Sequence, residues 1–189
     1  MLICGVDEAG RGPLAGKVYA AAVILNDTIP IIGLKDSKKL TANKRIELFE
    51  IIKKTAIAYA ITYVDEKCID EINILNATLL AMQNAVLSLS VTPDLVQIDG
   101  NRAPKLPIKT ETIIKGDTKI QAISAASILA KVSRDADMME LDKLYPMYQF
   151  AKHKGYGTEI HINAIKKYGI LPIHRKTFAP IKFMINHND

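Results

Sequence analysis

The chain has 189 residues, of which 49% are hydrophobic, 24% are charged and 6% are aromatic. This composition fits a single domain with an aliphatic core and excludes a disordered chain. No apolar run is long enough to cross a bilayer, and the N-terminal segment lacks the pattern of a secretion signal, so we expect no membrane association. The formal net charge is +5, which by itself is weak support for a nucleic-acid ligand.

Five segments rich in β-branched and small apolar residues are expected to be strands. They are residues 2–6, 18–25, 57–64, 95–98 and 110–114. A helix is expected from residue 42 to about 53, after an N-cap at Thr41. Asp65 is expected to cap a second helical segment, and a long helix follows it to about residue 89. Two further helices are expected over residues 120–144 and near 159–167. The alternation of strands and helices predicts a mixed α/β sheet covered by helices.

Two adjacent carboxylates, Asp7 and Glu8, follow the first apolar segment, and Gly10-Arg11-Gly12 comes directly after them. Carboxylates at the end of a buried strand are costly unless a cation neutralises them. Glycines let backbone N–H groups approach a ligand closely. The stretch therefore indicates metal-assisted chemistry on a phosphate backbone. Because neighbouring side chains of a strand point to opposite faces, Glu8 reaches a shared metal pair only if the strand ends or distorts there; otherwise it faces solvent or pairs with Arg11.

Two further carboxylates stand in short motifs. Asp99 precedes Gly100 at the end of the fourth expected strand, and Asp117 follows Lys115-Gly116 before a helix. A turn explains the first and a helix cap the second. Together with Asp7 and Glu8, they resemble the hard-oxygen ligand set of Mg²⁺ or Mn²⁺. If the strands before Asp7 and Asp99 are parallel neighbours, these two side chains lie close together.

Other motifs have ordinary structural interpretations. The small residues of 124–131 predict a helix packed closely on the sheet, and Arg134-Asp135 is interpreted as a surface pair. Tyr156, flanked by glycines and basic residues, either stacks on a sugar or base or anchors a loop. The four histidines have no zinc-like spacing and are assigned no metal: His153, His161, His174 and His187. Cys4 and Cys68 are far apart in the sequence, which favours a reducing, cytoplasmic setting.

In their order along the chain, these motifs resemble the type 2 ribonucleases H, specifically the bacterial ribonuclease HII family. The resemblance runs from Ile3 to about Phe178. Its blocks are Asp7 to Pro13, Asp36-Ser37-Lys38-Lys39-Leu40, Ile98-Asp99-Gly100, Lys115-Gly116-Asp117 with Ser124 to Lys131 and Arg134-Asp135, Gly155-Tyr156-Gly157-Thr158 and His174-Arg175-Lys176-Thr177-Phe178. The catalytic strand stands almost at the start, without the substrate-binding domain that precedes it in ribonuclease HIII, and no sliding-clamp peptide is apparent near the C-terminus.

The resemblance implies a ribonuclease H-like fold over residues 1–189, a mixed five-stranded sheet flanked by helices, with residues from about 145 onward as a small helical and loop appendage that binds substrate. It implies hydrolysis of the RNA strand of RNA/DNA hybrids and cleavage 5′ of single ribonucleotides in duplex DNA, leaving 3′-hydroxyl and 5′-phosphate ends. It makes Asp7, Glu8, Asp99 and Asp117 the catalytic ligands of Mn²⁺ or Mg²⁺, two ions with substrate. It gives substrate contacts to Gly10, Arg11, Gly12, Lys38, Lys39 and Tyr156. A cytoplasmic monomer is expected.

Two other functions compete with this one. A junction resolvase or transposase-like nuclease of the same fold would share the acidic ligands without requiring a 2′-hydroxyl. A non-catalytic hybrid-binding protein would leave its substrate intact, although unpaired carboxylates would then only repel the polyanion. Comparing all-DNA with ribonucleotide-containing duplexes separates these functions.

Overall fold

The computed structural model describes residues 1–34 and 39–185. At its centre lies a five-stranded sheet of order β3-β2-β1-β4-β5. The strands are β1 (Ile3–Ala9), β2 (Val18–Ile24), β3 (Ala58–Val64), β4 (Leu95–Asp99) and β5 (Thr110–Ile113). β2 is antiparallel to both β1 and β3, whereas β1, β4 and β5 run parallel. The predicted mixed sheet is confirmed.

The helices are α1 (Ala42–Thr55), α2 (Glu66–Ile72), α3 (Ile74–Leu87), α4 (Gly116–Lys119), α5 (Gln121–Leu144), α6 (Phe150–His153), α7 (Glu159–Tyr168) and α8 (Ile181–Ile185), with a 3₁₀ turn η2 at Pro146–Tyr148. Two predicted N-caps are confirmed: Thr41 accepts the N–H of Lys44, and Asp65 accepts the N–H of Cys68. Asn73, with φ 70°, separates α2 from α3.

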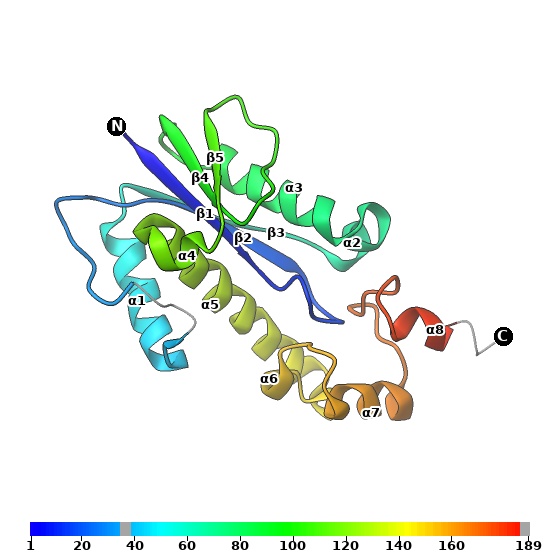
Figure 1. Ribbon diagram of the computed structural model, residues 1–189. Helices are drawn as coiled ribbons and strands as arrows, with labels where there is room; N and C mark the ends of the chain where they lie inside the picture. Colours follow the sequence, from blue (N-terminus) through cyan, green and yellow to red (C-terminus); the bar gives the residue numbers. More distant parts are fainter. Residues whose placement is uncertain (35–38, 186–189) are drawn as a thin grey trace.

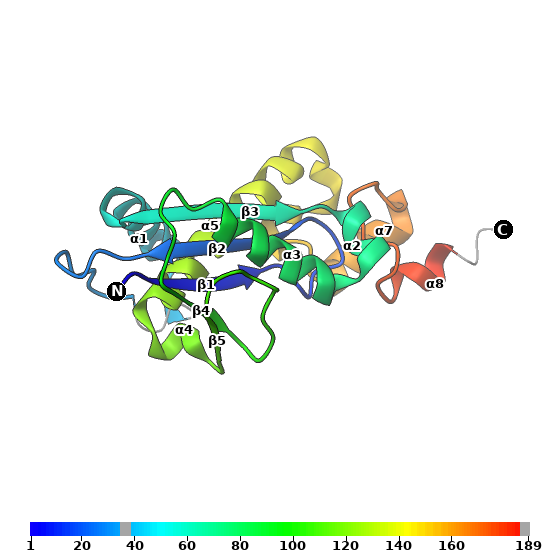
Figure 2. The same cartoon turned by 90° about the horizontal axis from the view of Figure 1, so that it is seen from above.

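The helices cover the two faces of the sheet separately, with α1 and α5 on one face and α2 and α3 on the other (Figures 1 and 2). β2 is buried along its whole length because alternate side chains enter different cores. Ala20 and Ala22 pack with α3, whereas Ala21 and Val23 pack with α5.

The Ala/Ser-rich part of α5 lies directly on the strands, as predicted. A Cβ atom added at Gly5 of β1 would stand 2.1 Å from the backbone carbon of Ala122, so only glycine permits this approach. The hydroxyl of Ser124 donates to the carbonyl oxygen of Leu34, which connects α5 to the segment before α1. The helix face therefore holds the sheet by close backbone packing.

The C-terminal part forms a third core at the far end of α5 (Figure 1). Tyr148 and Phe150 stack there with ring centroids 5.6 Å apart, and Leu14 and Ala15 of the loop after β1 join the same cluster. An isolated bridge between Ala15 and His174 adds backbone pairing. This part of the chain thereby reaches the loop that follows the first strand. Across the described residues, no helix is long and apolar enough to cross a membrane.

Candidate active site

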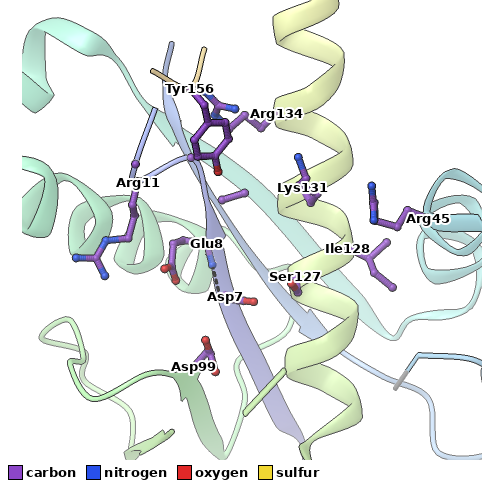
Figure 3. A pocket seen from close by; sticks show the side chains of 13 residues that line it. Asp7, Glu8, Arg11, Arg45, Asp99, Ser127, Ile128, Lys131, Arg134 and Tyr156 are labelled. Atoms are coloured by element: carbon purple, nitrogen blue, oxygen red, sulfur yellow. Dashed lines mark hydrogen bonds between the residues drawn. The ribbon is translucent and has the colours of Figure 1, made fainter. Parts of the chain in front are cut away.

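A pocket of about 550 Å³ opens where β1 ends, beside α5 (Figure 3). Three of the four predicted carboxylates line it, namely Asp7, Glu8 and Asp99. The predicted glycine loop and Tyr156 line it as well. The remaining lining residues are Ala9, Arg45, Ser127, Ile128, Lys131 and Arg134. The structure thus brings together residues that lie up to 149 positions apart in the sequence, from Asp7 to Tyr156.

The pocket exists because the sheet separates at this point. β1 pairs with β4 only as far as Val6 and Ile98, whereas its pairing with β2 continues to Ala9 and Tyr19. Beyond Val6, one side of β1 is therefore open toward the end of β4. Crevices at the carboxyl ends of parallel strands are common ligand sites.

Asp7 and Glu8 leave β1 on opposite sides, and Glu8 points to the side of Asp99 and Arg11 (Figure 3). β1 remains a paired strand through both residues, so the strand end or distortion that we expected Glu8 to need is absent. Instead, the separation of β1 from β4 leaves room for both carboxylates at one pocket. The backbone N–H of Glu8 donates to Oδ1 of Asp7 at 2.8 Å, which holds the first carboxylate against the strand.

The surroundings of Asp7 and Glu8 disfavour the charged forms of both side chains. Burial raises the pKa of Asp7 well above its usual value, and the nearby charges of Glu8 and Asp99 raise it further. Burial also raises the pKa of Glu8, although the hydrogen bond with Asp7 and the charge of Arg11 partly oppose this shift. Concentrated negative charge of this kind is relieved when a cation binds.

Asp117 lies beside this cluster and is 2% exposed. It is the second residue of α4, and the N–H groups of Gly116 and Asp117 approach Oδ1 of Asp99 at 2.6 and 3.4 Å. The expectation that Asp117 caps the helix is therefore wrong, since Lys115 is the N-cap of α4. It does not line the pocket surface.

The carboxylates suit a divalent metal by chemistry, because hard oxygen donors are what Mg²⁺ and Mn²⁺ prefer. Their positions are not those of a completed metal centre: within residues 1–34 and 39–185, no three His, Cys, Asp or Glu side chains converge closely enough to hold an ion. The donors that fit are grouped around one pocket, where burial raises the pKa of Asp7 and of Glu8.

The loop after β1 is held by two buried guanidinium groups. Arg175 donates to the carbonyl oxygens of Gly10, Arg11, Pro13 and Gly16. Arg134 donates to those of Ala15, Lys17 and Lys154. The interpretation of Arg134 as part of a surface pair is wrong, because it is 1% exposed and lies beneath the pocket. Its burial was not apparent from the adjacent Asp135.

Tyr156 stands at the pocket rim with 45% of its surface exposed. The guanidinium carbon of Arg134 lies 5.9 Å from the centre of its ring. Its backbone is anchored from behind: the carbonyl oxygen lies 2.9 Å from Nδ1 of His161. The ring is thus free on one side while the main chain is fixed, which suits a stacking surface.

Three histidines form a buried network behind Tyr156. The rings of His153 and His161 stack with centroids 4.3 Å apart, and Nε2 of His161 lies 2.9 Å from Nε2 of His174. Since Nδ1 of His174 accepts the N–H of Leu171, its Nε2 carries the proton toward His161 when the ring is neutral. Burial lowers the pKa of His161 and of His174 to about 4. The sequence showed no spacing that would predict this network.

The basic residues near the pocket differ partly from those predicted. Lys38 lies outside the described residues, and Lys39 is exposed without lining the pocket. Arg45 of α1 and Lys131 of α5, which were not among the predicted substrate contacts, face the pocket instead. Lys131 bridges Asp135 at 2.6 Å, one helical turn along. Helical spacing of 127, 128, 131 and 134 was the signal that could have identified this pocket-facing side of α5.

Comparisons with known proteins show the family to which the chain belongs. The family model described as ribonuclease HII matches residues 4–183. Curated ribonuclease HII proteins of Chromobacterium violaceum and Coxiella burnetii are 58% and 57% identical to the chain; the alignments cover 95% and 96% of the chain, and 91% and 90% of the relatives. The solved ribonuclease H2 of Pyrococcus horikoshii superposes with a TM-score of 0.82 at 28% identity, covering 99% of this chain and 98% of that one.

The fold and the acidic pocket define a nuclease of the ribonuclease H-like class, a metal-dependent phosphodiester hydrolase. Within that class, the chain belongs to the ribonuclease HII family. It is therefore an endoribonuclease that cleaves the RNA strand of RNA/DNA hybrids and cuts DNA at ribonucleotides.

Proposed function

We propose that the chain cuts on the 5′ side of a ribonucleotide and leaves 3′-hydroxyl and 5′-phosphate ends, with the 2′-hydroxyl read at the loop Gly10-Arg11-Gly12. The observation that carries this proposal is the single pocket shared by that loop and the acidic residues. A ribose seated against the loop leaves its neighbouring phosphate within the acidic part of the pocket. Because the 2′-hydroxyl distinguishes RNA from DNA, contact with it restricts cleavage to ribonucleotides.

Asp7, Glu8, Asp99 and Asp117 are the proposed ligands of two divalent ions, Mn²⁺ or Mg²⁺. When bound, such ions activate water and neutralise charge on the leaving oxygen. The residues themselves have separable tasks. Asp7 and Asp99 present oxygens at the ends of two strands, Glu8 extends from the open side of β1, and the buried Asp117 completes the set from the start of α4.

Further residues bind the duplex in this proposal. Tyr156 packs its exposed ring against the sugar next to the ribonucleotide, while Lys38 and Lys39 lie near the nucleic-acid backbone. Residues 145–189 act as the substrate-binding appendage of a single catalytic domain, a role supported by the position of Tyr156 in the pocket. In this proposal the protein acts as a monomer. The free thiols of Cys4 and Cys68 are consistent with the proposed cytoplasmic setting.

The test is cleavage of a DNA duplex that carries one ribonucleotide, beside an all-DNA duplex of the same sequence. We expect one cut, mapped to the 5′ side of the ribonucleotide, in Mg²⁺ and in Mn²⁺, and none in the all-DNA duplex. Equal cutting of both duplexes would favour a DNA nuclease of the same fold. An intact ribonucleotide duplex after long incubation with either ion would favour a binding protein.

A further inference from the structure

Arg175 is a fully buried cation whose bonds all go to main-chain oxygens. It is 0% exposed and donates to the carbonyl oxygens of Gly10 at 2.6 Å and of Arg11, Pro13 and Gly16 at 2.9 Å each. A buried charge is costly unless its donors are satisfied, and a guanidinium offers five N–H groups in a rigid fork. Four carbonyl oxygens of the loop after β1 accept hydrogen bonds from this fork.

These bonds determine which way the loop amides point. In a trans peptide, the N–H lies opposite the C=O of the same unit. The carbonyls of Gly10 and Arg11 turn toward Arg175, so the N–H groups of Arg11 and Gly12 point away from it. Both residues line the pocket, whereas Arg175 does not. Among the hydrogen bonds of the described residues, none is donated by either amide to another backbone group.

The peptide between Pro13 and Leu14 follows the same rule, and here the N–H has a partner in the structure. The carbonyl of Pro13 accepts from Arg175, and the N–H of Leu14 on the opposite side donates to the carbonyl of Gly155 at 2.8 Å. Arg175 therefore orders three peptide units of one loop in the same sense. Phe178 supports the guanidinium from the side, with its ring centre 5.1 Å from the guanidinium carbon.

We propose that Arg175 is a specificity-determining positioning residue: by holding the carbonyls of Gly10 and Arg11, it aims the amides of Arg11 and Gly12 at the ribose and thereby sets the preference for ribonucleotides. This inference rests on the proposed function of the glycine loop. Arg175 contacts no substrate itself. It acts from the C-terminal segment, 165 residues from Gly10 in sequence, through the backbone alone.

The test uses Arg175→Lys, which retains the charge but replaces the fork by a single ammonium group that cannot span four carbonyls. With a duplex that contains one ribonucleotide, we expect kcat/KM to fall about 100-fold, mainly through kcat, since the scissile phosphate is misplaced. Affinity for an all-DNA duplex without divalent ions should stay within about twofold, because the phosphate contacts of the pocket cations remain. Arg102→Lys, the same change at an exposed arginine, is the matched control.

Phe178→Leu provides a second and milder variant, since it removes the ring beside the guanidinium and keeps an apolar side chain against the neighbouring cores. A loss of about fivefold in cleavage, with unchanged DNA affinity, is the expected result, and it carries the test if Arg175→Lys does not fold. Cleavage by a folded Arg175→Lys protein within threefold of wild type would overturn the proposal. So would a parallel loss of DNA affinity and cleavage, which would assign Arg175 to general folding. Failure of the wild-type protein to distinguish the two duplexes would instead refute the proposed function.

Discussion

Oδ1 of Asp99 accepts the backbone N–H of Gly116 at 2.6 Å, and this hydrogen bond joins the end of β4 to the start of α4. The bond brings Asp117, the next residue, beside Asp99. The two acidic residues are therefore held next to each other by backbone geometry, while the charge of Asp99 raises the pKa of the neighbouring Asp7. A carboxylate that accepts amide hydrogen bonds keeps its position, since these charge-assisted bonds are short and strong.

Asp99→Asn tests whether the charge or the hydrogen bond matters more. The amide oxygen of Asn can still accept the N–H of Gly116, so we expect unchanged or slightly higher stability, because one repelling charge is removed. Cleavage should fall by about 100-fold or more, the usual cost of losing one electrostatic contribution to the transition state. Initial rates and urea unfolding measure the two effects.

Asp94→Asn is the matched control for this change. Asp94 also accepts a backbone N–H at 2.6 Å, from Leu2, but it lies before the opposite end of β4, away from the pocket. Its substitution should leave cleavage unchanged. Equal activity of Asp99→Asn and Asp94→Asn would remove Asp99 from the catalytic set.

Tyr156→Ala should impair cleavage at single ribonucleotides while leaving metal binding intact, since the ring lies at the rim of the pocket. A stacking contact is worth about 1–3 kcal/mol, which corresponds to a loss of about 5- to 150-fold. Kinetics with a one-ribonucleotide duplex and calorimetry with Mn²⁺ measure the two properties. Tyr59→Ala on β3, where the exposed fraction is 37%, should have no effect. Unchanged cleavage by Tyr156→Ala would make this tyrosine a structural residue.

Gly10→Ala combines two costs that a second glycine separates. At Gly10, φ is +92° and a new Cβ would stand 2.2 Å from Nε of Arg134. At Gly33, φ is +90° and nothing lies within 4 Å of a new Cβ. We expect Gly33→Ala to lower the free energy of unfolding by about 1–3 kcal/mol through backbone strain alone.

Gly10→Ala should cost more stability than Gly33→Ala and should also reduce cleavage, because displacing Arg134 loosens the loop. Urea denaturation of both variants gives the difference. Equal destabilisation by the two substitutions would show that Arg134 moves aside without cost.

The buried histidines predict a loss of stability in mild acid. In the folded protein, the pKa of His161 and of His174 lies near 4, below the ordinary value of 6.5. The unfolded chain therefore binds protons that the folded chain excludes. Their contribution to stability is complete above about pH 6.5 and is lost as the pH falls toward 4, by up to about 1.4 kcal/mol per pH unit for each histidine.

His174→Gln isolates this effect, since the shifts of Asp7 and Glu8 are common to both proteins and cancel in the comparison. Unfolding free energies at pH 7.5, 6 and 5 should decline less steeply for the variant than for wild type. Parallel declines would show that His174 accepts a proton within the fold.

Much of this protein follows from its sequence. Runs rich in β-branched and small apolar residues predicted all five strands, Thr41 and Asp65 predicted two helix starts, and the small residues of 124–131 predicted close packing on the sheet. The acidic residues and the glycine loop could be selected in advance, because their types carry recognisable chemistry at any position. These features depend on local secondary-structure preference and on residue identity, and both can be determined from the sequence alone.

The tertiary structure decided what depends on distant partners. Glu8 reaches the pocket because β1 and β4 stop pairing after Val6. No local sequence pattern specifies where the pairing of two distant strands ends. The pocket positions of Arg45 and Lys131, and the burial of Arg134 and Arg175, depend on which surfaces the helices and the C-terminal segment cover. From the sequence alone, an arginine is expected to lie on the solvated surface. Burying its charge becomes favourable only where the fold surrounds it with carbonyl oxygens.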